Sequence, residues 1–386
     1  MFARARLVVL AAIGGGLTGL VSYAFLESLD WATRTRIANG WLVWLLPAMG
    51  LVIAAVYFYW GGRAKGGTPA VVEQANVFTH GVPARMTPLI FGGSIGAHLV
   101  GASVGREGAA LQLAGSVTDT AAAAARLPHD DRRTLIAASL AGGWGALFAV
   151  PFAGIVFTLE VTRHHRWRAL LPAVVSAFSG KLVVDALGYE MGLRPQLPAP
   201  DWTIGLPFKL LLAGVVFGLL GRLFVGTLKM VRFRMGHHLK WPPIRAVVGG
   251  GATLGLMALV GRDYLGLSLP LMGEAFSGGH IEWWVPLIKL LFTIVALGTG
   301  FVGGEVTPLL VMGGTMGGAL SPGLHANQLL LATTGSAAVF AAAASVAFTG
   351  VVLTVEQFGW NSFLPALIVC LSARIAAGRP GLYVHH

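Results

Sequence analysis

Long apolar runs separated by short polar connections dominate this chain of 386 residues. A helix needs about 20 residues to cross the hydrocarbon core of a bilayer. Several runs reach or approach that length, and others are shorter or broken. The pattern predicts an all-α integral membrane protein in which some helices cross only part of the bilayer. The candidate membrane helices lie at residues 7–25, 41–60, 169–187, 208–225, 246–260, 285–301 and 329–355.

Composition supports a membrane protein. Hydrophobic residues make up 55% of the chain and charged residues 11%, with a mean hydropathy of +0.73. Soluble domains carry roughly a quarter charged residues. Arg4 and Arg6 precede the first apolar run, but no clear cleavage site follows before Trp31, so we expect a retained first helix. No soluble domain is expected, because the polar connections are too short to fold alone.

The formal charge of +11 does not indicate a nucleic-acid partner. Clusters at 132–133, 163–168 and 232–240 are interpreted as basic connections, which suit positive-inside loops and anionic lipid headgroups. No basic face with interleaved aromatic residues accompanies them. We expect a lipid bilayer as the surrounding, no nucleic acid, and an N-terminus on the cytoplasmic side.

The chain contains an internal repeat. Pro-Leu-Ile at 88–90 recurs at 286–288, a shift of 198 residues (286 − 88). Glu107 falls on Glu305 at the same shift. Each carboxylate stands among glycines inside apolar sequence, where an ionisable residue is costly and marks an ion or proton path.

The repeat continues downstream, where 152–160 resembles 348–356 at a shift of 196 residues (348 − 152). We therefore divide the chain into a first membrane repeat at 1–200 and a second at 201–386. Repeated halves with interrupted apolar segments indicate a transporter whose site lies between the repeats, near the middle of the bilayer.

Three glycine clusters, at 66–69, 105–108 and 303–308, precede helix-compatible sequence. The helices that follow are expected from Val71, Ala109 and Leu309 onward. Their free backbone N–H groups and positive dipole ends would point at one place inside the protein and bind an anion there. Such a site holds an anion without a full lysine or arginine charge, so the ion is released again.

These motifs resemble those of the CLC chloride channels and anion/proton antiporters. The segment 105–108 (Gly-Arg-Glu-Gly) looks like the gating-glutamate motif, and 304–308 (Gly-Glu-Val-Thr-Pro) falls on the second anion-site motif. The cluster 66–69 occupies the place of the first anion-site motif. Tyr383 lies where the pore tyrosine would be. The resemblance covers nearly the whole chain and implies a fold of two inverted-topology repeats with broken helices.

In detail the chain is similar to the fluoride-exporting branch, CLC-F. Val306 stands where the chloride branch usually has phenylalanine, and apolar Val161 follows Glu160 where chloride antiporters carry a proton-transfer glutamate. One departure concerns Gly66, which stands at the pore serine, where the fluoride branch often has methionine or asparagine.

The resemblance implies a homodimeric fluoride/proton antiporter of the inner (plasma) membrane that exports fluoride and uses no cofactor or metal. A chloride/proton antiporter and a passive fluoride or chloride channel are the alternatives. Glu107 and Glu305 are the expected gating and proton-coupling residues. The expected anion-binding residues are Gly66, Thr68, Gly105, Arg106, Gly108, Val306, Thr307 and Tyr383.

Plainer structural roles remain open for several of these residues. Glu107 could pair with Arg106, although neighbouring helix residues are expected to point in different directions. Thr68 and Thr307 could be helix N-caps, and Tyr383 could be an interfacial anchor. Glu160 and Glu356 are interpreted as helix-end residues rather than proton carriers.

Two segments of the chain fit a sequence motif of serine hydrolases. Segments 92–96 and 101–105 fit G-x-S-x-G, and His98 follows Ser94 by four residues, so a remote alternative is an intramembrane serine hydrolase. The motif is weak, since a nucleophile elbow requires a strand–turn–helix. No zinc-protease, P-loop or dinucleotide motif is present, and the single Cys370 excludes an intrachain disulfide.

Overall fold

The computed structural model describes residues 2–162, 166–192, 194–378 and 381–383. Within these ranges the chain is helical, and β-structure is limited to one isolated bridge. Short 3₁₀ segments lie at Gly40–Leu45, Gly62–Gly66 and Trp360–Ser362. The α-helices are α1 (Phe2–Ala38), α2 (Leu46–Trp60), α3 (Gly67–Asn76), α4 (Met86–Leu99), α5 (Glu107–Ala124), α6 (His129–Phe148), α7 (Pro151–Val161), α8 (Arg166–Ala186), α9 (Leu206–His238), α10 (Pro242–Val260), α11 (Leu269–Phe276), α12 (Val285–Thr299), α13 (Val306–Leu324), α14 (Gln328–Ala344), α15 (Ala347–Phe358) and α16 (Phe363–Ala377).

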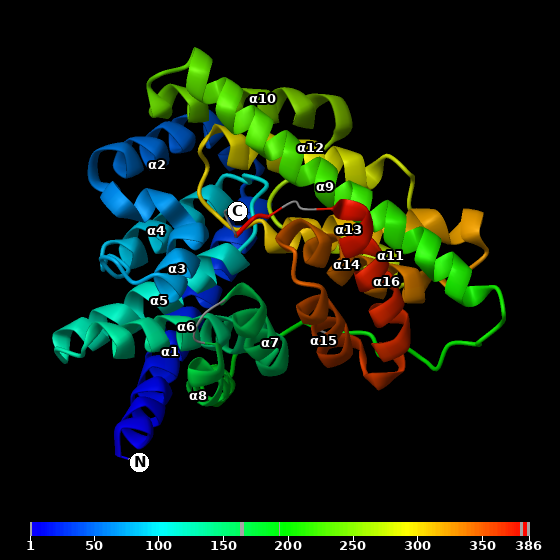
Figure 1. Cartoon of the computed structure of the whole chain (residues 1–386). Coiled ribbons are helices and arrows are strands. Elements are labelled where there is room, and N and C mark those ends of the chain that lie inside the picture. The colour runs from blue at the N-terminus through cyan, green and yellow to red at the C-terminus, as the bar shows by residue number, and fades with distance from the viewer. Residues whose placement is uncertain (1, 163–165, 193, 379–380, 384–386) are drawn as a thin grey trace.

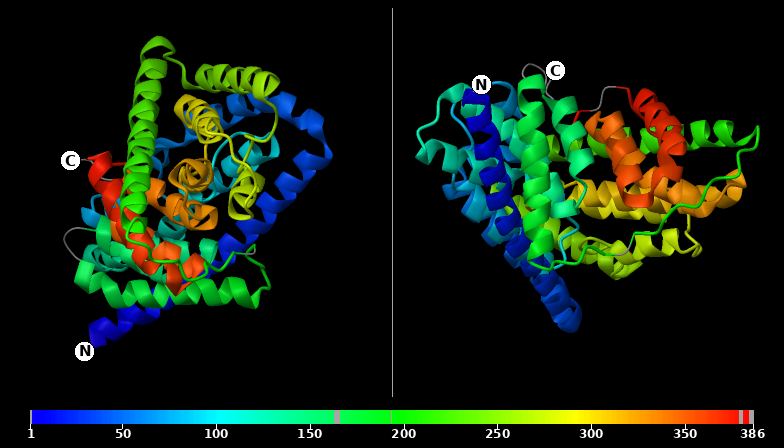
Figure 2. Two further views of the ribbon diagram at one scale, coloured as in Figure 1. Left: turned by 90° about the vertical axis from the view of Figure 1, so that its right-hand side faces the viewer. Right: turned by 90° about the horizontal axis from the view of Figure 1, so that it is seen from below.

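Helices of the second half repeat the order of those in the first. α12 begins 199 residues after α4 (285 − 86), and α13 begins 199 residues after α5 (306 − 107). α15 likewise begins 196 residues after α7 (347 − 151). The helices of the first half lie on one side of the molecule and α11–α16 on the other in two perpendicular views (Figures 1 and 2). The division expected near residue 200 falls in the connection between α8 and α9.

Six helical stretches within the described ranges are long and apolar enough to cross a membrane. Helices α7, α12, α14 and α15 are apolar but shorter. The expectation of full and partial spans is therefore confirmed. The spanning candidates are Ala5–Ala38, Gly40–Trp60, Trp167–Ala186, Leu206–His238, Pro242–Val260 and Trp360–Ala377.

The prediction of one helix over 329–355 is wrong, because the chain breaks between α14 and α15. Ser345 adopts a left-handed conformation (φ 63°), and Val346 is extended at φ −126°. Ala149 makes the same kind of break between α6 and α7 (φ 53°). Neither left-handed residue is a glycine. Pro151, two residues after Ala149, is a local stop signal for the first break, whereas no glycine or proline stands within three residues after Ser345.

Small residues bring the helices into backbone contact. A methyl group on Gly145 of α6 would lie 2.1 Å from the carbonyl oxygen of Ala177 in α8, and one on Gly15 of α1 would lie 2.4 Å from that of Ser176. Membrane helices pack closely through such residues. Glycines on α1 and α6 thus hold the scaffold around the centre of the molecule.

The interpretation of the basic clusters as connections is wrong for most of their residues. Arg132 and Arg133 lie in the first turn of α6, and Arg168 lies in α8. Arg232 lies more than a turn before the end of α9. Residues 163–165 lie outside the described ranges. A long helix such as α9 extends past its apolar run and includes the charged residues that follow. In the sequence, a charged stretch within such a helix looks the same as a charged loop.

Candidate functional site

The N-termini of α5 and α13 meet in the interior of the protein. Just before each helix, Gly105 and Gly304 form an antiparallel bridge: each backbone N–H donates to the other residue's carbonyl oxygen, both at 2.6 Å. The two residues lie one position away from exact repeat partners, since 304 − 105 is 199 and the repeat shift is 198. The bridge therefore joins the two glutamate motifs directly.

Glycine is required at this junction by the closeness of the two chains. A methyl group on Gly304 would lie 2.3 Å from the backbone nitrogen of Gly108. One on Gly105 would lie 2.8 Å from Cδ of Pro308 and 2.9 Å from the carbonyl oxygen of Gly304. No side chain fits between these backbones, which explains the glycine two residues before Glu107 and the glycine directly before Glu305.

The Glu107 carboxylate lies at the first turn of α13. Its Oε2 accepts the backbone N–H of Thr307 at 2.8 Å and that of Arg106 at 3.1 Å. Its Oε1 accepts the hydroxyl of Thr307. The Glu107 side chain is 2% exposed. A negatively charged group thus occupies the place where the free N–H groups and the dipole of α13 favour an anion.

Glu107 also contacts the arginine that precedes it. The Nε atom of Arg106 lies 3.7 Å from Oε1 of Glu107. The expectation that these two side chains diverge is wrong, because Arg106 is the residue before α5 and not a member of it. Its backbone can therefore place the guanidinium beside the carboxylate.

Glu305 occupies the repeat position of Glu107 but has different surroundings. It precedes α13 and lines a cavity of about 610 Å³. The hydroxyl of Tyr383 lies close enough to interact electrostatically with the Glu305 carboxylate, although it makes no hydrogen bond of standard geometry within the described chain. Tyr383 is 3% exposed and packs edge-on against Phe157, with 5.8 Å between ring centroids. It is therefore an interior residue and not an interfacial anchor.

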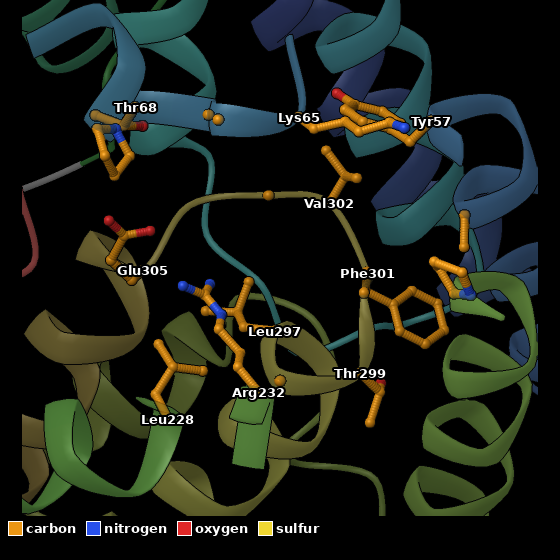
Figure 3. Close-up of a pocket in the computed structure, with 18 of the residues that line it drawn as sticks. Tyr57, Lys65, Thr68, Leu228, Arg232, Leu297, Thr299, Phe301, Val302 and Glu305 are labelled. Atoms are coloured by element: carbon orange, nitrogen blue, oxygen red, sulfur yellow. The ribbon is translucent and has the colours of Figure 1, made fainter. Parts of the chain in front are cut away.

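The cavity reaches from the first anion motif to Glu305. Figure 3 shows Thr68 above Glu305, with the Arg232 side chain projecting from α9 toward Glu305 from the other side. Its polar and charged lining consists of Tyr57, Lys65, Thr68, Gln112, Arg232, Arg245, Thr299 and Glu305, and Gly66 and Gly67 contribute backbone.

The helices at the site begin earlier than expected. α3 begins at Gly67, α5 at Glu107 and α13 at Val306, rather than at Val71, Ala109 and Leu309. The prolines at 69 and 308 stand third in their helices, within the first turn, where proline is tolerated.

The N-cap interpretation of the two threonines is wrong. The residues before α3 and α13 are Gly66 and Glu305, and neither makes a side-chain cap. Thr68 donates its hydroxyl to the carbonyl oxygen of Gly108 at 3.1 Å and so connects α3 to α5. Thr307 instead binds Glu107. The two threonines, each of which directly precedes a proline, therefore make different contacts: Thr68 binds a backbone oxygen and Thr307 binds a carboxylate.

Glu160 and Glu356 are helix-end residues with a function that the sequence did not reveal. The Glu160 carboxylate, at the end of α7, accepts backbone N–H groups of Phe348 (3.1 Å) and Thr349 (2.7 Å) at the start of α15. Glu356, at the end of α15, accepts those of Phe152 (3.0 Å) and Ala153 (2.6 Å) at the start of α7. Each glutamate thus caps the matching helix of the other half.

Lys289 is a second residue that sequence reasoning missed, although a lysine inside the run 285–301 was visible. It is fully buried in α12. Its ammonium donates to the hydroxyls of Ser103 (2.9 Å) and Ser268 (2.8 Å) and to the carbonyl oxygens of Gly266 (2.7 Å) and Tyr264 (3.2 Å). Lys289 thereby fixes the segment that leads into the Glu107 motif.

The serine-hydrolase alternative gains no support from this geometry. Ser94 lies inside α4, and the Nδ1 atom of His98 is 2.8 Å from the backbone oxygen of Ser94, not from its hydroxyl. Ser103 binds Lys289. Neither serine lies in a strand–turn–helix. Within the described residues, no group of three or more His, Cys, Asp or Glu side chains is placed to hold a metal ion.

Residues 49–378 match the family described as voltage gated chloride channel. The chain belongs to the CLC family. A chloride/fluoride channel protein of Pseudomonas syringae pv. tomato is 35% identical to it over 98% of this chain and 86% of the relative. The H(+)/Cl(-) exchange transporter ClcA of Klebsiella pneumoniae subsp. pneumoniae is 28% identical over 95% of this chain and 84% of the relative.

Solved structures agree. The crystal structure of a CLC-type fluoride/proton antiporter matches with a TM-score of 0.95 and 31% identity, covering 99% of this chain and 98% of that one. A slow cyanobacterial Cl-/H+ antiporter matches with a TM-score of 0.83 and 18% identity, covering 96% and 94%, which shows the fold. This is a multi-pass membrane protein with the CLC fold, and its family consists of ion channels and transporters.

Proposed function

We propose that the protein is a fluoride/proton antiporter that exports fluoride from the cytoplasm across the inner (plasma) membrane. The observation that carries the proposal is the Glu107 carboxylate bound at the N-terminus of α13. The Glu-Val-Thr-Pro sequence at 305–308 and the similarity to the fluoride/proton antiporter structure support fluoride as the ion. The similarity to ClcA keeps chloride as the second candidate.

In the proposed mechanism, ionised Glu107 is a tethered competitor of the anion. Its carboxylate takes the hydrogen bonds of Thr307 that a fluoride ion would take. Protonation removes the negative charge, and the charge-assisted hydrogen bonds that hold the side chain, worth about 1.5–3 kcal/mol each, become ordinary ones. The side chain then leaves and fluoride binds in its place. One carboxylate thereby links proton and anion movement.

The anion site itself is proposed to use backbone donors at the start of α13, from Val306 and Thr307, with the hydroxyls of Thr307 and Tyr383. Fluoride needs such close donors because they must replace its lost hydration water. Arg106 supplies positive charge beside the site. Gly66, Gly105 and Gly108 allow the backbones to approach. Thr68 is proposed to shape the pathway, since its hydroxyl already binds the carbonyl oxygen of Gly108.

Glu305 is proposed as the second proton-coupling residue. It faces the cavity, whereas Glu107 is enclosed at the junction of the repeats. A proton arriving through the cavity therefore meets Glu305 before Glu107. Tyr383 lies near the Glu305 carboxylate and is placed to share that proton's path.

Reconstituted protein tests the ion and the coupling. We expect liposomes containing the purified protein to release fluoride at least about tenfold faster than chloride, the discrimination that 1.4 kcal/mol provides. An imposed fluoride gradient should drive protons in the opposite direction, as read by a pH-sensitive dye. Chloride release that equals or exceeds fluoride release would contradict fluoride selectivity and favour a chloride/proton antiporter. Fluoride release without proton movement would identify a passive channel.

We also infer that the protein partner is a second copy of the chain. Large apolar side chains on α7, α8 and α15 are exposed, including Phe152 (56%), Leu171 (56%) and Phe348 (57%). Phe152 and Phe348 also donate their backbone N–H groups to the caps made by Glu356 and Glu160. Apolar side chains are therefore exposed where α7 and α15 are held together. The mass of the protein in a detergent micelle, after the detergent contribution is subtracted, is expected to be twice the chain mass of 40.3 kDa. A particle of one chain mass contradicts the dimer.

A further inference from the structure

Three cationic side chains line the cavity, and two of them are already bound by the protein. The ammonium of Lys65 donates to the carbonyl oxygen of Phe58 at 2.9 Å and lies 5.2 Å from the centre of its ring. The guanidinium of Arg245 donates to the carbonyl oxygens of Leu239, Lys240 and Gly236. Both side chains therefore have their donors turned to the backbone.

Arg232 is the third cationic side chain, and its N–H donors do not bind backbone oxygens of the described residues. No hydrogen bond or ion pair within 4.0 Å joins its guanidinium to the described part of the chain, although its charge interacts with that of Glu305. Arg232 follows Leu228 by four residues on the same face of α9, and both line the cavity. Figure 3 shows the guanidinium directed into the cavity, with the Glu305 carboxylate nearby.

We propose that Arg232 is a vestibular capture site for the transported anion, separate from the central site at Glu107. This inference rests on the proposed anion transport and adds a station to it. The side chain offers five N–H donors and a permanent positive charge. A cleft lined by one sign of charge raises the local concentration of the opposite ion. Because the guanidinium is open to the cavity, binding stays weak enough for the ion to move on.

Glu305 controls this site by competition. When Glu305 is ionised, its charge partly neutralises that of Arg232 and repels an anion from the cavity. When Glu305 is protonated, the Arg232 charge is available to the anion. The other charged groups near Glu305 or on the cavity wall have fixed partners: Lys65 and Arg245 bind backbone oxygens, and Glu107 is held by Thr307. The Tyr383 hydroxyl also lies near the Glu305 carboxylate, but it is neutral and does not cancel the Arg232 charge. Capture at Arg232 is thus favoured by the same proton that the antiport cycle uses.

Saturation kinetics test the proposal. In liposomes, Arg232→Gln is expected to raise the fluoride concentration that gives half-maximal release by about five- to tenfold, with a smaller effect on the maximal rate, because one charged interaction is lost. Arg232→Lys keeps the charge and should recover most of the affinity. Arg234→Gln is the matched control: the same charge is removed from an exposed residue two positions away on α9 that does not line the cavity.

A chemical rescue separates charge from shape. Arg232→Cys should show the same loss, and 2-(trimethylammonio)ethyl methanethiosulfonate, which attaches a positive group, should restore the affinity. 2-Sulfonatoethyl methanethiosulfonate, which attaches a negative group, should weaken it further. The native Cys370 is fully buried, so treated wild-type protein is the control for both reagents.

Two outcomes overturn the capture site: equal half-saturation for Arg232→Gln and Arg234→Gln, or the same response of Arg232→Cys to both reagents. Failure of the proposed function is visible separately, in the wild type alone. If wild-type protein moves chloride and no fluoride, fluoride export is contradicted, and the Arg232 comparison is made with chloride as the transported ion.

Discussion

Glu107→Gln is expected to abolish fluoride-driven proton movement. The amide has nearly the size of the carboxylate, and its oxygen can still accept the N–H of Thr307, so the protein should fold. The variant cannot exchange a charged state for a neutral one, which is the event that links anion and proton. The measurement is the proton flux into liposomes under a fluoride gradient, together with the thermal unfolding of the purified protein. Undiminished proton flux from a folded variant would remove Glu107 from the coupling.

Glu305→Gln is the matched comparison, because it makes the same change at the corresponding position of the second repeat. We expect transport to fall while the protein remains folded, since Glu305 faces the cavity and its neutral amide has nearly the size of the carboxylate. Fluoride release at the wild-type rate would make Glu305 a structural residue. The pair thus separates the two carboxylates experimentally.

The repeat in the sequence predicted that Glu107 and Glu305 are equivalent in position. Both lie at the start of matching helices, Glu107 as the first residue of α5 and Glu305 as the residue before α13. The repeat did not predict that their side chains lie in different surroundings. The bridge between Gly105 and Gly304 places both motifs side by side, but the two carboxylates point to different places. Glu107 lies at the first turn of α13, and Glu305 faces the cavity. A duplicated motif therefore gives two chemical environments.

The helical membrane architecture was predictable because each spanning run carries its own signal of length and hydrophobicity. The helix break at Ser345 was not predictable, because its left-handed residue is not a glycine and no proline follows within three residues. The break at Ala149 has a local signal in Pro151, two residues later. The mutual caps of Glu160 and Glu356 were also beyond the sequence. These caps join residues that are 188 and 204 positions apart in the sequence.

Charges inside apolar runs show the same limit. Lys289 was visible as a lysine among hydrophobic residues, but its four oxygen partners come from segments that only the fold brings together. Arg232 was interpreted as part of a basic connection, because a charge cluster after an apolar run usually lies in water or among headgroups. The length of α9 carries it to the cavity instead. In both cases the residue type showed that a charge in apolar sequence is energetically unfavourable. Only the tertiary structure showed which groups that charge contacts.

Gly304→Ala is expected to destroy the junction between the two halves. The added methyl group would lie 2.3 Å from the backbone nitrogen of Gly108 and 3.1 Å from that of Glu107. These are backbone atoms at the start of α5, so no side chain can rotate away. Relief requires the bridge to Gly105 to open, which displaces Glu107 from the first turn of α13. Overpacking of this kind costs about 1–3 kcal/mol, and more where backbone must move.

We expect fluoride release by Gly304→Ala to fall by about fivefold or more, since 1 kcal/mol corresponds to about that factor. The variant should also unfold at a lower temperature than wild type. Gly255→Ala is the control, because a methyl group on this glycine of α10 meets nothing within 4 Å. It also replaces glycine by a better helix former, so stability should hold or rise. Wild-type transport by Gly304→Ala would contradict the close backbone junction, and with it the placement of Glu107 at the anion site.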